Sequence, residues 1–128
     1  MVYITGDIHG EIDIHRLGGD TFPEGKELTK SDCLIIAGDF GLIWSNTEAG
    51  AKTESYWLNW LHNQKKFTTL FIDGNHENFN RLDRLPPVEM FGAPVGKVND
   101  CVYHLRRGEI YTIEGRKFFT FGGAISWD

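Results

Sequence analysis

The chain has 128 residues, of which 41% are hydrophobic and 24% charged, with a formal net charge of −5. A chain of this length normally folds as one domain. The acidic balance, without a cluster of Lys and Arg, argues against general nucleic-acid binding. No apolar run approaches the roughly 20 residues that cross a bilayer, and no signal sequence is recognisable, so we expect no membrane contact. Cys33 and Cys101 fit no metal or redox spacing, and we interpret them as reduced packing residues of a cytoplasmic protein.

The first predicted element is a short strand at residues 2–4, which are all apolar and typical of β-structure. It leads into the sequence Gly6-Asp7-Ile8-His9-Gly10. In an extended backbone, residues two apart point to the same side, so Asp7 and His9 can reach one ion together. The other interpretation is that Asp7 caps a following helix and His9 is a surface histidine. This stretch alone does not separate the two.

A short helix at residues 11–17 and a loop at residues 20–32 are predicted before the next strand. Residues 33–37 are a continuous apolar run, which is typical of a strand buried on both faces of a parallel sheet. The run ends in Gly38-Asp39-Phe40-Gly41. A carboxylate therefore follows this strand, as Asp7 follows the first one.

Residues 53–64 predict a helix with one apolar face. This face consists of Trp57, Trp60, Leu61 and Gln64, and we expect it to pack in the core. Trp44 lies in the loop after Asp39 and has two interpretations: it walls a substrate pocket, or it covers the edge of the sheet.

A third strand, at residues 67–72, runs into Asp73-Gly74-Asn75-His76-Glu77. Strands that alternate with helices predict right-handed crossovers and a parallel sheet, whose carboxyl ends lie along one rim. The side chains expected to converge there are Asp7, His9, Asp39, Asn75 and His76. Such a set of oxygen and nitrogen donors suits Mn, Fe or Zn, and also Mg.

The last third of the chain predicts a short helix at residues 78–85 and then strands at residues 102–105, 110–113 and 117–121. Arg81 and Arg84 of the short helix are interpreted as solvated charges, with contact to a substrate phosphate as the alternative. The last two strands predict an antiparallel hairpin. The fold class is therefore α/β, with a mixed, largely parallel sheet flanked by helices and a C-terminal antiparallel hairpin.

The order GDIHG, GDFG and GNHE, each after a strand, resembles the first three motif blocks of the calcineurin-like metallophosphoesterase superfamily. The resemblance implies the N-terminal half of a metallophosphoesterase-type α/β sandwich. It implies that Asp7 and His9 bind a first metal ion, Asp39 bridges two ions and Asn75 binds the second. It makes His76 catalytic, to protonate the leaving oxygen or stabilise the phosphoryl group. The implied reaction is two-metal hydrolysis of phosphomonoesters or phosphodiesters, with Mn as the foremost metal.

The chain departs from the pattern of this superfamily in two ways. The two later motif blocks, which supply histidines to both metal sites, are absent, and His15, His62 and His104 lie in none of the required contexts. No arginine follows Asp39 as it does in the phosphoprotein phosphatases, which argues against a phosphoprotein substrate. We therefore expect a truncated single domain, residues 1–128, with weak metal retention.

Two functions from different classes follow from these matches and departures. The first is a metal-dependent phosphoesterase, a hydrolase of phosphate esters that is incomplete in this chain. The second is a catalytically incompetent scaffold that keeps the fold and binds a protein partner. In both cases, apolar surface left by the missing half predicts self-association.

Overall fold

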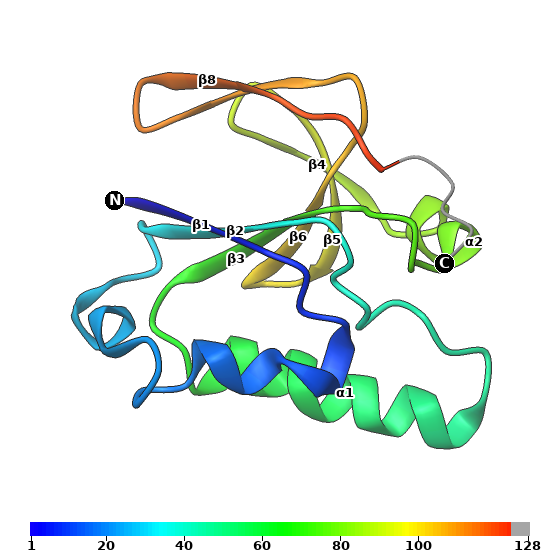
Figure 1. Ribbon diagram of the computed structural model, residues 1–128. Helices are drawn as coiled ribbons and strands as arrows, with labels where there is room; N and C mark the ends of the chain where they lie inside the picture. Colours follow the sequence, from blue (N-terminus) through cyan, green and yellow to red (C-terminus); the bar gives the residue numbers. More distant parts are fainter. Residues whose placement is uncertain (124–128) are drawn as a thin grey trace.

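The computed structural model describes residues 1–123, which are built around a six-stranded sheet with the order β1-β2-β3-β6-β5-β4 (Figure 1). The strands of this sheet are β1 (Val2–Gly6), β2 (Cys33–Ala37), β3 (Thr68–Ile72), β4 (Pro87–Met90), β5 (Ala93–Asn99) and β6 (Val102–Leu105). A separate antiparallel hairpin consists of β7 (Ile110–Ile113) and β8 (Arg116–Phe119). The α-helices are α1 (Glu48–Asn63) and α2 (Phe79–Asp83), and the 3-10 helices are η1 (Gly10–Ile12), η2 (Ile14–Leu17) and η3 (Pro23–Glu27).

The sheet is parallel where the candidate site lies and antiparallel farther away. Strands β1, β2, β3 and β6 pair in parallel, whereas β5 pairs antiparallel with both β6 and β4. The last residues of the first three strands, Gly6, Ala37 and Ile72, are in register with one another. Their carboxyl ends therefore form one level rim. This arrangement confirms the predicted mixed, largely parallel sheet with a C-terminal antiparallel hairpin.

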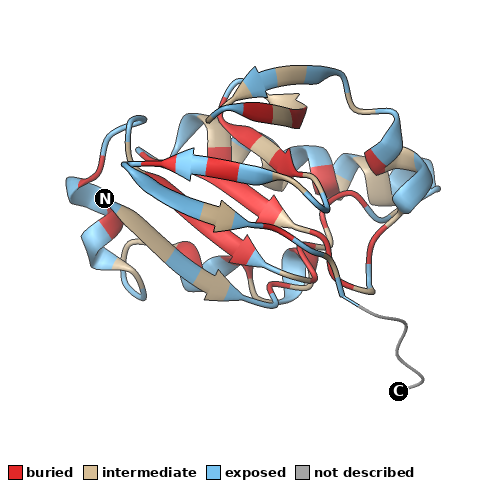
Figure 2. Ribbon diagram, turned by 90° about the horizontal axis from the view of Figure 1, so that it is seen from above, coloured by how far each residue is buried: buried red, intermediate tan, exposed pale blue. Residues whose placement is uncertain are grey.

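The two faces of the sheet carry different layers. Figure 1 shows α1 and the 3-10 helices η1 and η2 along one face and the β7–β8 hairpin over the other. Side chains alternate along β2, so that Leu34 and Ile36 pack with the helices while Cys33 and Ile35 pack under the hairpin. All four are buried, as predicted for a strand covered on both faces, and Figure 2 shows buried residues concentrated in the central strands.

Helix α1 begins at Glu48, earlier than the start predicted at Thr53. Its N-cap is Thr47, whose hydroxyl oxygen accepts a hydrogen bond from the backbone N–H of Gly50 at 3.1 Å. The predicted inner face packs as expected at Trp57, Trp60 and Leu61. Gln64 is exposed at the C-cap and does not belong to that face.

The sequence prediction missed strands β4 and β5, because prolines and glycines interrupt their apolar pattern. Pro87 is tolerated because β4 lies at the edge of the sheet. Between the two strands, Phe91 and Gly92 both have positive φ, as the tight turns that join antiparallel strands require. Helix α2 is shorter than the helix predicted at residues 78–85, and β8 begins and ends earlier than the strand predicted at residues 117–121.

Residues 11–17 do not form the single helix that was predicted. The backbone leaves helical geometry at Asp13, whose φ is −118° and ψ 6°, and this splits the segment into η1 and η2. The predicted loop at residues 20–32 contains η3, which begins at Pro23. Both cysteines are buried and unpaired. Among residues 1–123, no helix is long and apolar enough to cross a membrane.

Candidate metal centre

The loops that follow β1 and β2 are held together by backbone hydrogen bonds at the rim of the sheet. The N–H groups of Ile8 and His9 both donate to the carbonyl of Asp39, at 3.1 and 2.8 Å, and Gly10 donates to Phe40 at 2.8 Å. Gly41 has φ of +74°, and a Cβ there would collide with the backbone of Gly10. The close approach of the two loops therefore depends on a residue without a side chain.

Asp39 lies between two imidazoles in this rim. Its Oδ2 is 3.1 Å from Nδ1 of His76 and 3.7 Å from Nε2 of His9. Ligand atoms of these three residues all lie within 4.8 Å of one another. Asp39 is 7% exposed, and a Cβ on Gly74 would collide with its carboxylate. A buried carboxylate between two imidazoles is a donor set that fits a divalent ion such as Mn, Fe or Zn.

The electrostatic environment keeps Asp39 ionised. Burial by itself raises the pKa of a carboxyl group, but hydrogen bonds from the backbone and ring of His76, together with the nearby imidazole of His9, outweigh it and lower the pKa of Asp39. The backbone N–H of His76 donates to Oδ1 of Asp39 at 3.0 Å. The carboxylate is thus negatively charged at neutral pH, as a metal ligand must be.

The backbone at His9 is not the extended strand assumed from the sequence. Strand β1 ends at Gly6, and His9 has φ of 52° and ψ of 49°, in the left-handed region. Asp39 also has a positive φ, 45°. Non-glycine residues adopt this conformation infrequently, and it recurs at functional sites.

Asp7 and Asn75 line a different cavity from the two imidazoles. Together with Asp39 they line a cavity of about 390 Å³, whereas His9 and His76 line a neighbouring one of about 420 Å³. Asp7 is exposed and is not among the three residues whose ligand atoms cluster. The structure therefore divides the five predicted residues between two cavities: Asp7, Asp39 and Asn75 line one, and His9 and His76 line the other.

Two further residues, Arg16 and Glu77, hold the loops at this rim. Arg16 of η2 donates a hydrogen bond to the carbonyl of Asp7, which holds the first loop. Glu77 follows the candidate ligands directly and is buried. It accepts hydrogen bonds from three backbone N–H groups: those of Phe40 at 3.3 Å, Gly41 at 2.8 Å and Gly74 at 3.3 Å. Burial raises the pKa of Glu77 to about 7 in spite of these donors. Glu77 thus ties the second loop to the third.

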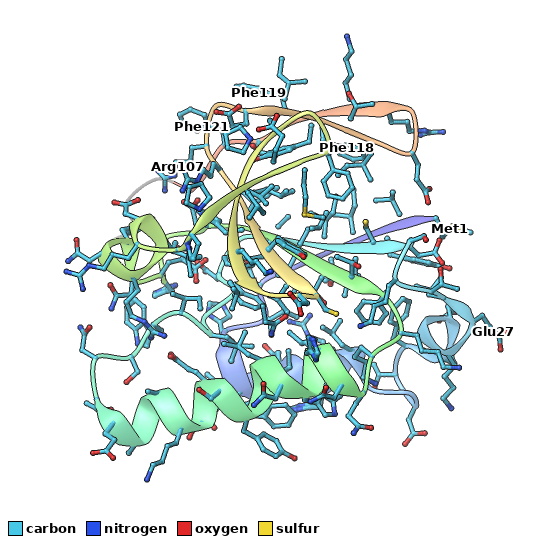
Figure 3. The ribbon with its side chains drawn as sticks, turned by 180° about the vertical axis from the view of Figure 1, so that it is seen from behind. Met1, Glu27, Arg107, Phe118, Phe119 and Phe121 are labelled. Atoms are coloured by element: carbon cyan, nitrogen blue, oxygen red, sulfur yellow. The ribbon has the colours of Figure 1, made fainter. Side chains whose placement is uncertain are left out.

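A second network of hydrogen bonds holds the loop after β3 at Asp73. Asp73 is 2% exposed, and its carboxylate accepts hydrogen bonds from Nε2 of His104 at 2.9 Å and from Nε of Arg107 at 2.6 Å (Arg107 is labelled in Figure 3). Burial opposes ionisation, but the two partners lower the pKa of Asp73. His104 therefore has a positioning role that its place in a late strand did not reveal. His15 is exposed on η2, and His62 contacts Asn63.

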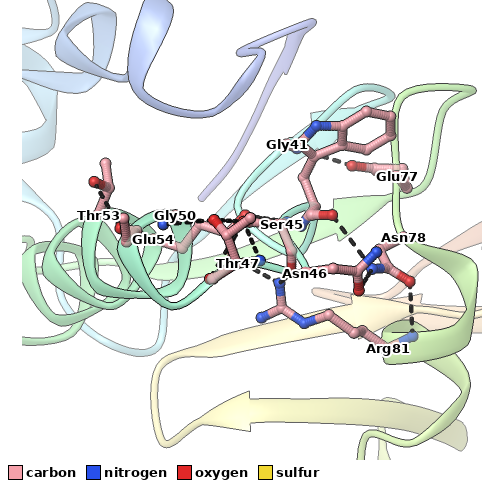
Figure 4. Close-up of polar contacts among 12 residues, drawn as sticks. Gly41, Ser45, Asn46, Thr47, Gly50, Thr53, Glu54, Glu77, Asn78 and Arg81 are labelled. Carbon is pink, nitrogen blue, oxygen red and sulfur yellow. Dashed lines mark hydrogen bonds and ion pairs between the residues drawn. The ribbon is translucent and has the colours of Figure 1, made fainter.

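A third network fixes the loop between β2 and α1. Glu54 of α1 is 6% exposed, and Arg81 of α2 donates to its Oε1 at 2.6 Å and to the carbonyl of Ser45 at 2.8 Å (Figure 4). The interpretation of Arg81 as a solvated charge was wrong, because the helix that carries it packs against α1 through this ion pair. No local spacing signals the pair, since its two members lie on different helices.

Comparison with known families agrees with this geometry. A model of the calcineurin-like phosphoesterase family matches residues 1–128, which is the whole chain. Searches of curated proteins and of solved structures found no significant match. The motifs that suggested this family from the sequence lie at the three adjacent strand ends described above. The chain therefore belongs to the calcineurin-like phosphoesterase family.

Proposed function

We propose that the protein is a metal-dependent hydrolase of phosphomonoesters or phosphodiesters that works by a two-metal mechanism. The family acts on phosphate esters and depends on divalent metal ions. The observation that carries the proposal is the buried carboxylate of Asp39, which lies between His9 and His76 where the three motif loops meet.

In this proposal, Asp7 and His9 would hold a first ion, Asn75 would hold a second and Asp39 would be a ligand of both. Mn is the foremost candidate, with Fe, Zn and Mg as alternatives. When bound, two such ions would supply Lewis acidity for the attack of water at phosphorus. The bridging carboxylate offsets the repulsion between the ions. Because Asn75 is neutral, the site keeps the positive charge that attracts a phosphate group.

The chain itself supplies a proton donor in His76. Its ring is half exposed and lines the 420 Å³ cavity, while its Nδ1 lies beside Asp39. When the ring is the protonated imidazolium, Nδ1–H donates to the carboxylate and Nε2–H is left to give its proton to the leaving oxygen, which leaves a neutral imidazole behind. Asp39 also fixes the ring orientation, since it accepts from the backbone and the side chain of the same histidine.

The proposal is tested by hydrolysis of p-nitrophenyl phosphate with and without Mn. We expect Mn-dependent turnover that Asp39→Asn lowers at least a hundredfold, because the substitution removes the charge shared by both ions. Asp20→Asn, in an exposed loop, is the matched control and should retain wild-type turnover. Turnover that survives Asp39→Asn would contradict the site. A wild-type chain that shows no turnover with any of the four metals would instead favour the scaffold that binds a protein partner.

We further propose that the chain self-associates. The support is a set of large apolar side chains left exposed on the hairpin side of the sheet, which includes Phe119 and Phe121 (Figure 3). A cytoplasmic location is also inferred, supported by the two buried and unpaired cysteines.

A further inference from the structure

Trp44 is an exposed aromatic residue beside the candidate centre. Its side chain is 51% exposed, so it is not a core residue and covers the sheet edge incompletely. It lines the same 420 Å³ cavity as His9 and His76. The centroid of its ring is 6.3 Å from that of His76, and the two rings meet at 66°. Ile12, another exposed apolar residue, lines this cavity too.

The backbone that carries Trp44 is held firmly in place. Its N–H and that of Ser45 both donate to Oε2 of Glu54, at 2.9 and 2.8 Å. Its carbonyl accepts from the side chain of Asn78 at 3.3 Å. The ion pair of Glu54 with Arg81 completes this support (Figure 4). Because the backbone is already fixed, only the indole side chain has to be ordered when it meets a ligand, and this low cost is a property of preorganised binding surfaces.

The position of Trp44 relative to the two cavities identifies which part of a substrate it meets. This step rests on the proposed function, in which His76 gives a proton to the leaving oxygen. The leaving group then lies on the side of His76, in the cavity with Trp44 and Ile12, while Asp7 and Asn75 line the other cavity. We propose that Trp44 stacks on a planar aromatic leaving group, so that the preferred substrate is an aryl phosphomonoester.

The short distance between the two rings favours an aryl group over a nucleoside. An aromatic ring bonded directly to the ester oxygen stays close to the proton donor and can reach an indole whose ring centroid is 6.3 Å from that of His76. A nucleobase is separated from its phosphate by a pentose, so it lies farther from the proton donor than a directly bonded aryl ring does. Glu11 also lines this cavity and is unfavourable to a leaving group with its own negative charge.

The test compares three substrates of the Mn-loaded chain: 1-naphthyl phosphate, adenosine 5′-monophosphate and glycerol 2-phosphate. We expect Trp44→Ala to lower the ratio of kcat/KM for the naphthyl ester to kcat/KM for the glycerol ester by about tenfold, as aromatic stacking contributes in other sites. Trp44→Phe should keep most of the ratio. Tyr56→Ala, which removes an exposed aromatic residue of α1 outside the cavity, should leave the ratio unchanged.

Calorimetry provides a readout without turnover. Phenylphosphonate should bind the Mn-loaded wild type more tightly than methylphosphonate, and Trp44→Ala should remove most of that difference. The inference would be overturned if Trp44→Ala kept both the wild-type ratio of kcat/KM values and the preference for phenylphosphonate. It would also be overturned if Trp44→Ala lowered kcat/KM for adenosine 5′-monophosphate alone. If the wild type neither hydrolyses any of the three esters nor binds methylphosphonate, the proposed function fails, whatever residue stands at position 44.

Discussion

At the scale of single residues, the centre depends on buried carboxylates that act in different ways. Asp39 is held ionised between imidazoles and is the proposed ligand, whereas Glu77 satisfies backbone donors of the loops around it. Such buried donors are costly when they lose their acceptor, because water cannot replace it. Glu77 is therefore a structural requirement of the site rather than one of its ligands.

Glu77→Gln tests this structural role. A glutamine presents only one oxygen, so at least one of the N–H groups of Phe40, Gly41 and Gly74 loses its acceptor and faces an amide N–H instead. We expect a loss of about 1 to 3 kcal/mol in the free energy of unfolding, measured in urea without metal. Glu24→Gln, which makes the same change at an exposed position, should leave stability within about 0.5 kcal/mol of wild type. Equal stability of the two variants would show that Glu77 does not hold the loops.

The buried thiol of Cys33 is expected to make the free energy of unfolding depend on pH in the alkaline range. The thiol is 2% exposed, and burial, assisted by the charge of Glu114, raises its pKa from about 9 to about 11. The folded state therefore binds this proton more tightly than the unfolded state. The resulting stabilisation is complete below pH 9 and is lost as pH rises from about 9 to about 11, by about 2 kcal/mol.

Urea unfolding of wild type and Cys33→Ala between pH 8 and pH 10.5 measures this loss. The variant is expected to be less stable at pH 8, because it leaves a small cavity, but to decline less steeply above pH 9. Parallel declines in the two proteins would assign the pH dependence to other groups.

At the scale of elements, apolar runs and motifs could be predicted from sequence, whereas partners distant in the chain could not. Strands β2, β6 and β7 have the predicted bounds because each is a short, continuous or alternating apolar segment. The β4–β5 hairpin was missed because its pattern is broken, and α1 was started late because Thr47 stands in a polar stretch without an apolar period.

In the candidate site, too, the residues in local motifs could be predicted from the sequence, whereas the contacts between distant residues could not. Its five motif residues were named from sequence because each follows a strand. The networks that hold them join Asp73 to His104 and Glu54 to Arg81, whose members lie on different elements and share no spacing that could reveal a contact. Tertiary packing alone brings these groups together.

The ion pair between α1 and α2 can be tested against a neighbouring arginine. Arg81→Ala leaves Glu54 buried without its charged partner, so we expect a loss of about 2 to 4 kcal/mol in the free energy of unfolding. Arg84→Ala, at the exposed C-cap of the same helix, should cost less than about 0.5 kcal/mol. Urea denaturation of both variants makes the comparison. If both variants lost less than about 0.5 kcal/mol in the free energy of unfolding, Arg81 would be a solvated charge after all.

At the scale of the whole molecule, the two layers that cover the sheet differ in completeness. The helix side is closed by α1 and the 3-10 helices, and its core includes Leu61, Phe67 and Phe71. On the hairpin side, Tyr111 and Ile113 face the sheet and are buried, while the opposite face of the hairpin exposes Ile110 and its cross-strand partner Phe119. The exposed hairpin residues and Ile4 of β1 leave large apolar side chains uncovered on this side.

This asymmetry predicts where self-association occurs. The apolar surface on the hairpin comprises Ile110, Phe119 and Phe121, with Phe119 and Phe121 each 67% exposed and their rings 6.4 Å apart. Burying these side chains between two copies is favourable by the hydrophobic effect, and a charge placed among them would have to be desolvated.

Phe119→Lys is therefore expected to weaken the association constant at least tenfold, as measured by sedimentation equilibrium across a range of protein concentrations. Tyr56→Lys introduces the same charge at an exposed aromatic residue of α1, on the helix side, and should associate like the wild type. Because the driving force is apolar, raising the salt concentration should not dissociate the wild-type oligomer, as it would one held by surface ion pairs. A wild-type chain that remains monomeric at all concentrations, or a Tyr56→Lys variant that dissociates as readily as Phe119→Lys, would contradict association through the hairpin.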